Sequence, residues 1–342
     1  MSSRLDSKPQ IWTLAADLGL PASESPTRTV VQFATARIRR IAKKFRCTSL
    51  NDLLAATAGE VQTTFEEIHS DRDMQQIQLK YIEKGERAFA NLEMELRGIG
   101  DYAITIRRTH REGWEPHFIS VIDCRGDKVY RSYFSKWHEL AHLLTLTPQM
   151  RLVFRRTHCA ALAQDPEEML MDIIAGEAGF FRDFLPSDTV SDISFESIRQ
   201  IKEECCPDAS TQAATIGIVK ALPIPCILLE AKVGFRKQEK VDAMQLGLGI
   251  GEGTAAPALR AVHVTLNEAA REAGIRFHKN WRVPPESVIS RVFADGGYSE
   301  STEDLSWWAT SDGSRLDPCP VFVKAQKNWD SVQALIIPQL FG

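Results

Sequence analysis

The motif His138-Glu139-Leu140-Ala141-His142 is the feature that most restricts how this chain can fold. It lies in SYFSKWHELAHLLTL, whose apolar residues recur with the period of a helix. Positions i and i+4 of a helix lie about 40° apart around the axis and about 6 Å apart along it, so two imidazoles there can converge on one ion. The motif therefore predicts a helix that presents His138 and His142 to a zinc ion, which binds imidazole nitrogen well.

Glu139 directly follows the first histidine of this motif. A glutamate in that place can take a proton from an attacking water and later pass it to the leaving amine. Two histidines can also share a helix face by chance, as surface or half-buried residues. The presence of a third ligand downstream distinguishes these two interpretations.

Two patterns can supply a third ligand. One pattern needs a glycine and a histidine soon after the motif. The following sequence, LLTLTPQMRLV, lacks both, and the one nearby downstream histidine is His158. The other uses a glutamate on a second helix with an acid four residues later, which Glu168 and Asp172 satisfy. Glu168 could bind the zinc, and Asp172 could accept the N–H of a zinc-bound histidine. Glu167 and Glu177 compete, and acids are favoured at a helix N-terminus in any case.

Composition limits the class of protein. The chain has 342 residues, of which 44% are hydrophobic and 25% charged, which indicates a soluble globular protein of two domains, or one large domain with an appendage. The net charge of −4 does not suggest a general polyanion binder. Seven irregularly spaced cysteines argue against a disulfide framework. Without a signal-peptide pattern or a long apolar run, we expect a cytoplasmic protein.

The order of expected elements places the motif between strands and helices. Residues 27–97 look helical, YAITIRRTH and HFISVIDC have the alternation of strands, and EEMLMDIIAGEAGFFRDFL follows the helix-start signal Asp165-Pro166. Two short helices, SFESIRQIKEEC and DASTQAATIGIVKAL, precede the strand PCILLEAKV. The Gly- and Ala-rich residues 247–259 suggest a linker, and a small mixed α/β region follows them.

The residues around the motif resemble the ImmA/IrrE-type metallopeptidases. EEMLMDIIAGEAGFF is similar to the second helix of that family, with Glu168, Asp172 and Ala175 in its Glu, Asp or Asn, and Ala positions. HFISVIDC before FSKWHELAHLL resembles the family's strand and motif helix, with Phe134-Ser135 in the place of Phe-Thr. The chain departs from the family where this second helix usually ends in Leu-Met-Pro, since Phe180-Phe181 come first here.

This resemblance implies a fold and a division of the chain. The fold is α+β, with a mostly helical zincin-like (gluzincin) peptidase domain that contains a small β-sheet, followed by a small mixed α/β GAF-like domain. The tail from about Arg260 is similar to the GAF-like sensor of IrrE-type members. The implied boundaries are 1–97 for an N-terminal helical region packed on the peptidase, 98–232 for the metallopeptidase with a helix-turn-helix-like segment, and 246–342 for the sensor.

The resemblance also implies a function. Such proteins are zinc endopeptidases that cleave a helix-turn-helix repressor after DNA damage or a related stress, with one Zn²⁺ and with Glu139 as the general base. The domain order is most similar to CapP-type members of anti-phage defence operons. The alternatives are a non-catalytic zinc-containing transcription regulator or nucleic-acid-binding sensor, and a metal-dependent hydrolase that acts on another substrate.

Several residues could regulate or assist this chemistry. Zinc with three protein ligands keeps an open position that a thiolate could block, with Cys124 as first candidate and Cys159 as second, although each could be an ordinary half-buried cysteine. The transition state needs a further hydrogen-bond donor, for which the candidates are Tyr130, Tyr133, His117 and His158.

The activating ligand of the C-terminal region could be single-stranded DNA or a small molecule. Trp281, Trp307 and Trp308 lie near basic residues, and aromatic rings beside cations can stack bases and neutralise phosphates. The same tryptophans could equally be ordinary core residues beside solvated charges. The basic cluster Arg37–Lys44 has the same two interpretations.

Overall fold

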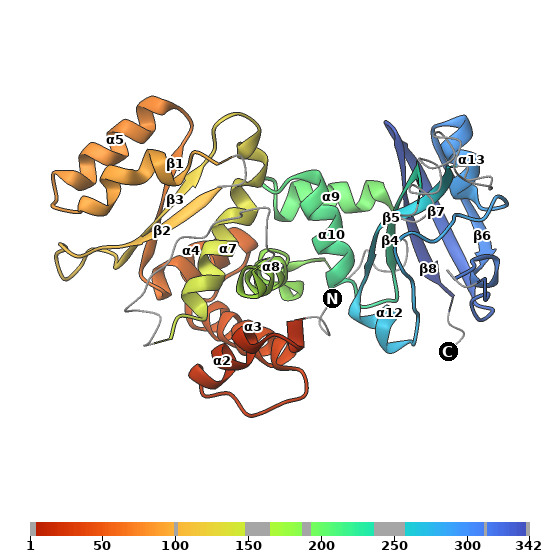
Figure 1. Cartoon of the computed structure of the whole chain (residues 1–342), viewed down its shortest axis with the longest axis horizontal. Helices are drawn as coiled ribbons and strands as arrows, with labels where there is room; N and C mark the ends of the chain where they lie inside the picture. Colours follow the sequence, from red (N-terminus) through yellow and green to blue (C-terminus); the bar gives the residue numbers. More distant parts are fainter. Residues whose placement is uncertain are drawn as a thin grey trace, which may run out of the picture. The chain divides into compact units, whose positions relative to one another are not determined.

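A computed structural model of the chain describes residues 5–98, 102–147, 165–186, 193–235, 257–310 and 313–339 (Figure 1). These residues form a mixed α+β structure with two separate sheets, which confirms the α+β class. The chain divides into two compact units: Met1–Pro186 with Arg199–Gly217, and Ser187–Ile198 with Ile218–Gly342. Among the described residues, no helix is both long enough and apolar enough to cross a membrane.

The first unit begins with helices that precede its sheet. These are α2 (Pro9–Asp17), α3 (Pro26–Phe45) and α4 (Leu50–Glu60). Ser49 caps α4 by accepting a hydrogen bond from the Asp52 amide, as this residue type does at a helix start. Buried apolar residues of α2 and α3, including Ile11 and Val30, form one core with Ala141 and Leu170, so these helices pack against the motif helix and its partner.

A three-stranded sheet forms the middle layer of this unit, with the order β1-β3-β2. Its strands are β1 (Thr63–Ile68), β2 (Ala103–Arg107) and β3 (Phe118–Asp123), with β1 parallel and β2 antiparallel to β3. The expectation of an all-helical stretch over residues 27–97 is therefore wrong at β1. The segment TTFEEI lacks a clear strand alternation, and it becomes a strand because all six of its residues pair with β3.

The two faces of this sheet have different roles. One face is apolar, and its core of Ile104, Ile119 and Val121 is covered by α5 (Asp71–Ile82) and by the short helices η1 (Arg87–Asn91) and α6 (Leu92–Glu95). The expected continuous helix over these segments is interrupted at Gly85, whose φ of +85° belongs to the left-handed region. The opposite face lies under α7 (Ser132–Leu144), the helix that carries the motif (Figure 1).

Helix α7 packs closely against α8 (Pro166–Gly179). A short helix, η2 (Gly126–Arg131), leads from β3 into α7 where a simple turn was expected at Arg125-Gly126-Asp127. The start of α8 agrees with the sequence prediction, because the Asp165 side chain accepts a hydrogen bond from the Glu167 amide and Pro166 occupies the first turn. The helix ends at Gly179, six residues before Leu185 where the prediction ended it, and η4 (Arg182–Phe184) follows.

The second unit is built on one antiparallel sheet with the order β5-β4-β8-β7-β6. The helices α9 (Phe195–Cys205) and α10 (Thr211–Ala221), which include the positions where the chain passes between the units, agree with their prediction. The strands and remaining helices are β4 (Ile227–Gly234), β5 (Ala258–Leu266), α12 (Glu268–Glu272), α13 (Val288–Asp295), β6 (Tyr298–Asp304), η6 (Leu305–Trp307), β7 (Pro320–Asn328) and β8 (Ser331–Pro338).

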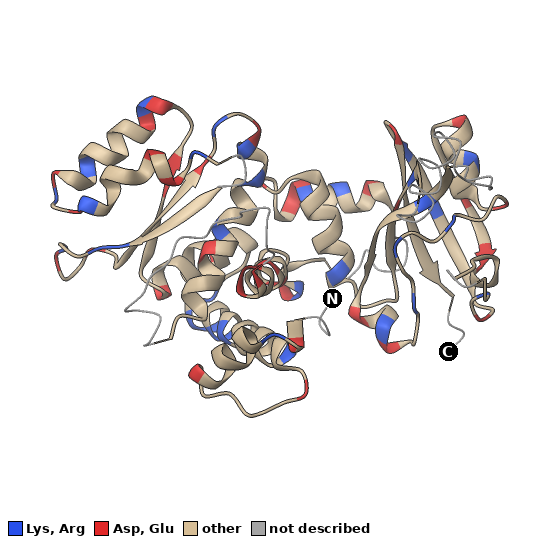
Figure 2. Cartoon of the chain, viewed as in Figure 1, with Lys and Arg blue, Asp and Glu red and all other residues tan. Residues whose placement is uncertain are grey.

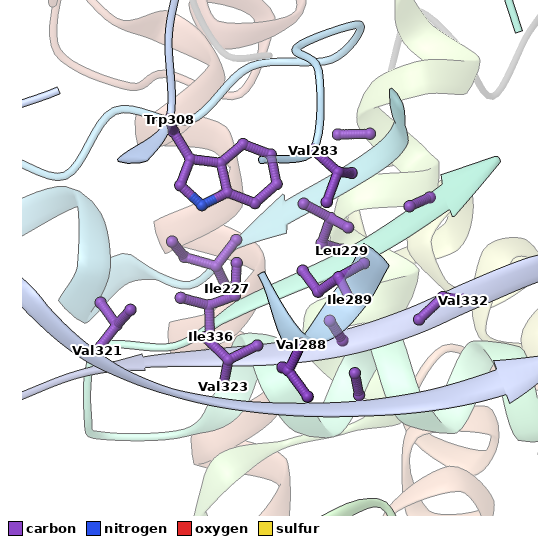
Figure 3. Packing of buried hydrophobic residues seen from close by; sticks show 14 of the residues in the cluster. Ile227, Leu229, Val283, Val288, Ile289, Trp308, Val321, Val323, Val332 and Ile336 are labelled. Atoms are coloured by element: carbon purple, nitrogen blue, oxygen red, sulfur yellow. The ribbon is translucent and has the colours of Figure 1, made fainter. Parts of the chain in front are cut away.

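One hydrophobic core holds this second sheet to α13. Ile289 of α13 lies among Leu229, Val323 and Ile336 of the strands, with the Trp308 ring beside them (Figure 3). Trp281 and Trp308 are both buried in this core, so their rings are not available to stack bases, whereas Trp307 remains exposed. The interpretation of these two tryptophans as core residues is therefore the correct one.

The predicted domain boundaries remain a prediction. The structure does show that β4, which those boundaries assign to the peptidase region, is hydrogen-bonded between β5 and β8 of the second unit's sheet. Residues 247–256 of the suggested linker lie outside the described residues.

Glu86 provides a test of how the β2–β3 hairpin is held. Its buried carboxylate accepts hydrogen bonds from the Thr109 amide at 2.8 Å, the His110 amide at 3.0 Å and the Arg108 Nε at 3.2 Å. Burial opposes ionisation, but these donors outweigh it and lower the pKa of Glu86. Because the folded pKa lies below the unfolded value of about 4.3, the stabilisation is complete above that pH and is lost as pH falls through the folded pKa.

We therefore expect Glu86→Gln to lower the free energy of unfolding by about 1.5–3 kcal/mol at neutral pH. The difference from the wild type should narrow as pH falls from about 7 toward about 3. Urea unfolding at several pH values measures both effects, with the exposed Glu83→Gln as the control that should change stability by less than about 0.5 kcal/mol. A loss that is independent of pH would contradict this account.

The α7–α8 contact gives a second test within one helix. A Cβ on Gly179 would lie 2.9 Å from Cδ1 of the buried Trp137, whereas a Cβ on Gly176 would have no neighbour within 4 Å. Gly179→Ala should destabilise the protein by about 1–3 kcal/mol through overpacking. Gly176→Ala should instead stabilise it by about 0.5–1 kcal/mol, because alanine is the better helix former. Thermal unfolding of both variants measures this, and equal shifts of the same sign would refute it.

Candidate metal centre

The motif histidines converge as the sequence predicts. Nε2 of His138 and Nε2 of His142 lie 3.2 Å apart, on the side of α7 that packs against α8. His138 is buried and His142 is half-buried. Two ring nitrogens at this separation point to a common position between them, which is the arrangement that a shared metal ion requires.

Glu168 supplies the third donor from the first turn of α8. Its Oε2 lies 3.1 Å from Nε2 of His138, and its Oε1 lies 3.5 Å from Nε2 of His142. Together with the two histidines it forms a group of potential metal ligands whose donor atoms all lie within 4.8 Å of one another. The competing acids Glu167 and Glu177 are not members of this group. Figure 2 marks the acidic residues of α8 in red on the ribbon.

Asp172 lies one helical turn beyond Glu168 and reaches the other nitrogen of the same imidazole. Its Oδ1 is 2.9 Å from Nδ1 of His138. This contact requires Nδ1 to carry a hydrogen, which leaves Nε2 as the nitrogen that can bind a metal. Asp172 thus holds the ring in the tautomer that metal binding needs.

The distances among these donors fit a zinc ion. With zinc–nitrogen and zinc–oxygen bonds of about 2.0–2.2 Å, ligand atoms of a tetrahedral site lie about 3.3–3.5 Å apart. The three measured separations are 3.1, 3.2 and 3.5 Å, so the donors are already spaced for one ion. Two imidazoles and a carboxylate are also a ligand set that zinc favours in catalytic sites.

The electrostatics of the metal-free site lead to the same conclusion. Burial opposes protonation of His138, but hydrogen bonds to Asp172 and Glu168 outweigh it and raise its pKa to about 10. Burial likewise opposes ionisation of Glu168, but its hydrogen bonds to His138 and His142 outweigh it and lower its pKa to about 2. The acids of α8 therefore favour a positive charge between the two helices.

Glu139 is buried between α7 and the sheet, and its two oxygens have different surroundings. Oε2 accepts a hydrogen bond from the Thr105 hydroxyl of β2 at 2.5 Å. Oε1 is buried and has no hydrogen-bond partner among the described residues. One oxygen is thus anchored by the sheet, and the other keeps its full capacity to accept a proton or a hydrogen bond.

A row of hydroxyls extends this anchor across the sheet. The Thr105 hydroxyl lies 2.7 Å from that of Ser120 on β3, which lies 3.1 Å from that of Thr63 on β1. All three residues are buried. Because an ionised Glu139 only accepts, Thr105 donates to it and Ser120 donates to Thr105, so the row is oriented toward the carboxylate.

The sequence interpretation missed these three hydroxyl residues. A signal for Thr105 and Ser120 exists in the strands AITIR and FISVID, where each interrupts a buried run of apolar residues, 103–106 and 118–122. A buried hydroxyl needs a hydrogen-bond partner, so such a position points to a polar group across the sheet face. The identity of that group depends on the packing of α7 and is not visible in the sequence.

The structure does not bring the other predicted residues to the histidine pair. Cys124 belongs to a different group of donors, with Glu67 and His69. Tyr133 is buried and its hydroxyl donates to the Gly179 carbonyl, so its proton is already used within the core. Tyr130 is exposed on η2. His158 and Cys159 lie outside the described residues.

Comparisons with known proteins do not assign a family to this chain. No protein-family model matches it, and no curated protein sequence matches it. A Mycobacterium tuberculosis transcriptional regulator of known structure is similar over 99% of this chain and 82% of its own, with 10% identity and a TM-score of 0.39. A similarity at that level carries no argument about fold or function, so the site must be interpreted from its own geometry.

Thr105 gives a direct test of the buried carboxylate. Thr105→Val keeps the shape of the side chain but removes its hydrogen bonds to Glu139 and to Ser120, so we expect a loss of about 1–3 kcal/mol in the free energy of unfolding. Thr105→Ser retains the hydroxyl and should restore most of that loss. Urea unfolding at neutral pH measures both variants, and a valine variant as stable as the serine variant would show that the hydrogen bond is unimportant.

Proposed function

We propose that this chain is a zinc-dependent peptidase, with His138, His142 and Glu168 as the metal ligands and Glu139 as the general base. The observation that carries the proposal is the state of Glu139: it is buried beside the ligand group, one oxygen is held by Thr105, and the other has no partner. A buried carboxylate oxygen without a donor is costly to stability, and such exceptions call for a functional explanation.

The residues of the site divide the chemistry among them. His138, His142 and Glu168 would hold the ion, which when bound supplies Lewis-acid polarisation of a carbonyl and activation of water. Asp172 would keep His138 in the correct tautomer. Glu139 would accept the proton of the attacking water on Oε1 and deliver it to the leaving amine, while Thr105 keeps the carboxylate from rotating.

A purely structural zinc site is the main competing function. Structural zinc is normally enclosed by four protein ligands, whereas three donors meet here among the described residues. A structural site also has no use for a buried carboxylate beside its ligands. The geometry therefore favours catalysis over the alternative of a zinc-containing regulator without activity.

A pocket within the first unit provides room near the end of α7. It has a volume of about 270 Å³ and is lined by residues that include Leu143 of α7, Arg37 of α3, and Arg107 and His117 at the ends of β2 and β3. Arg37 also donates to the Leu144 carbonyl at 2.7 Å, which fixes it against the end of the helix. We propose this pocket as a place where part of a peptide substrate binds.

The resemblance to ImmA/IrrE-type metallopeptidases extends this proposal to a biological role. On that basis the substrate is a helix-turn-helix repressor, cleavage follows DNA damage or a related stress, and the second unit is a GAF-like sensor, as in CapP-type members. The second unit's antiparallel sheet, with α13 packed on one face, supports a small sensor-type domain at the level of architecture. The nature of its activating ligand remains a prediction.

The proposal is tested by Glu139→Gln. The variant should bind zinc like the wild type, because Glu139 is not a ligand, but its peptide cleavage should fall about 10²- to 10⁴-fold with loss of the base. Cleavage is followed by mass spectrometry on a peptide library and on helix-turn-helix repressors encoded near the gene, and zinc by elemental analysis. Glu167→Gln, one residue from the ligand Glu168, is the matched control and should retain both properties. Undiminished cleavage by Glu139→Gln would refute the assigned role.

A further inference from the structure

A second group of metal-binding side chains lies at the other end of the same sheet face. Glu67 is the penultimate residue of β1, His69 directly follows β1, and Cys124 directly follows β3. The strands β1 and β3 are parallel, so both lead to the same edge, and the Cys124 amide donates to the Ile68 carbonyl at 2.8 Å. The topology therefore brings together a carboxylate, an imidazole and a thiol that the sequence keeps apart.

The donor atoms of these three residues are spaced for one ion. Glu67 Oε2 lies 3.2 Å from Nε2 of His69 and 3.9 Å from Sγ of Cys124, and all three donor atoms lie within 4.8 Å of one another. At a tetrahedral zinc, oxygen–nitrogen and oxygen–sulfur separations are about 3.4 Å and about 3.6 Å. Small rotations of the side chains would bring the group to those values.

The chemistry of the group selects a class of cation. Mg²⁺ and Ca²⁺ prefer oxygen ligands, whereas a thiolate with an imidazole and a carboxylate suits Zn²⁺ and similar transition-metal ions. Cys124 is buried, while 58% of the His69 side chain is exposed. An ion held by one buried and one exposed ligand remains accessible from solvent, so it can exchange.

A lysine of the motif helix lies beside this group. Lys136 Nζ lies 2.7 Å from Oε1 of Glu67, and Lys136 is three residues before Glu139 on the face of α7 that meets the sheet. The other oxygen of Glu67, Oε2, faces His69 and accepts a hydrogen bond from the Cys124 thiol. A divalent ion bound there would take the place of the thiol proton, which is released to solvent, and the Lys136 ammonium would oppose its charge.

We propose that Glu67, His69 and Cys124 form a second, exchangeable site for a divalent transition-metal ion such as Zn²⁺, beside the ammonium of Lys136 on α7. The site shares no ligand with the His138–His142–Glu168 group. It is connected to that group through α7, because Lys136 and His138 belong to the same two turns of helix. The proposal does not depend on peptidase activity, since it rests on donors that take no part in the proposed hydrolysis.

Cobalt provides the most direct test, because a Co²⁺–thiolate bond gives a charge-transfer band in the near ultraviolet that histidine and carboxylate ligands do not. Reduced, metal-free full-length protein is titrated with Co²⁺ and, separately, dialysed against Zn²⁺ for elemental analysis. We expect two ions per chain and a thiolate band. Cys124→Ser should lose the band and one ion, and the double variant His138→Ala with His142→Ala should lose the other ion and keep the band.

Three further variants separate metal binding from misfolding and from unspecific effects. His69→Asn changes an exposed side chain and should weaken the second ion about tenfold or more without affecting the first. Cys47→Ser is the matched control, because Cys47 is a half-buried cysteine outside both groups, and it should keep both ions and the band. Lys136→Met removes the competing ammonium and should tighten the second ion about three- to tenfold.

Either of two results would overturn the proposal. A single ion per chain that gives no thiolate band, or a second ion that gives no thiolate band and survives both Cys124→Ser and His69→Asn, would show that this group does not bind metal. The result of the Glu139→Gln cleavage assay does not affect this metal-binding test. The two proposals can therefore fail independently.

Discussion

The contact on which the site depends is the placement of one imidazole between two acids of a neighbouring helix. His138 of α7 meets Asp172 through Nδ1 and Glu168 through Nε2, so both of its nitrogens are directed by α8. This contact sets the rotation of α7 about its own axis. Once that rotation is set, Glu139, the next residue, must point to the sheet, and His142 must point back to Glu168. The close approach of Gly179 to Trp137 allows the two helices to be near enough for all of this.

Helix α7 therefore makes polar contacts on two of its faces. The face toward α8 collects the donors of the candidate metal centre, and the face toward the sheet meets polar side chains in an otherwise apolar layer. At one point Glu139 accepts from Thr105, and one turn earlier Lys136 pairs with Glu67. A buried polar group such as the Glu139 carboxylate is costly unless it is satisfied, so its contact with Thr105 restricts the helix to one register over the sheet. The proposed second ion would bind the carboxylate that Lys136 pairs with, so it would lie beside the helix that carries the proposed catalytic residues.

Prediction from the sequence succeeded where a local pattern is strong. It failed where the structure of a segment depends on residues far away in the chain. Asp165-Pro166 marked the start of α8, and spacing alone related Glu168 and Asp172 to the motif. The strand β1 was missed because TTFEEI, in the midst of helices, becomes a strand only by pairing with β3, and strand preference depends strongly on such context. Trp281 lies next to Arg282 in the sequence, but burial in the second unit's core determines what Trp281 and Trp308 do.

The sequence by itself determined the spacing that any helix must convert into geometry: two histidines four residues apart, and two acids four residues apart on a second helix. Helical periodicity is local, so no tertiary information was needed to place each pair on one face. Only the tertiary structure decided which groups those faces meet. The anchoring of Glu139 by Thr105, and the meeting of Cys124 with Glu67 and His69 instead of with the histidine pair, both follow from strand order and from the way α7 lies across the sheet. These are contacts between residues far apart in the chain, and no local pattern encodes them.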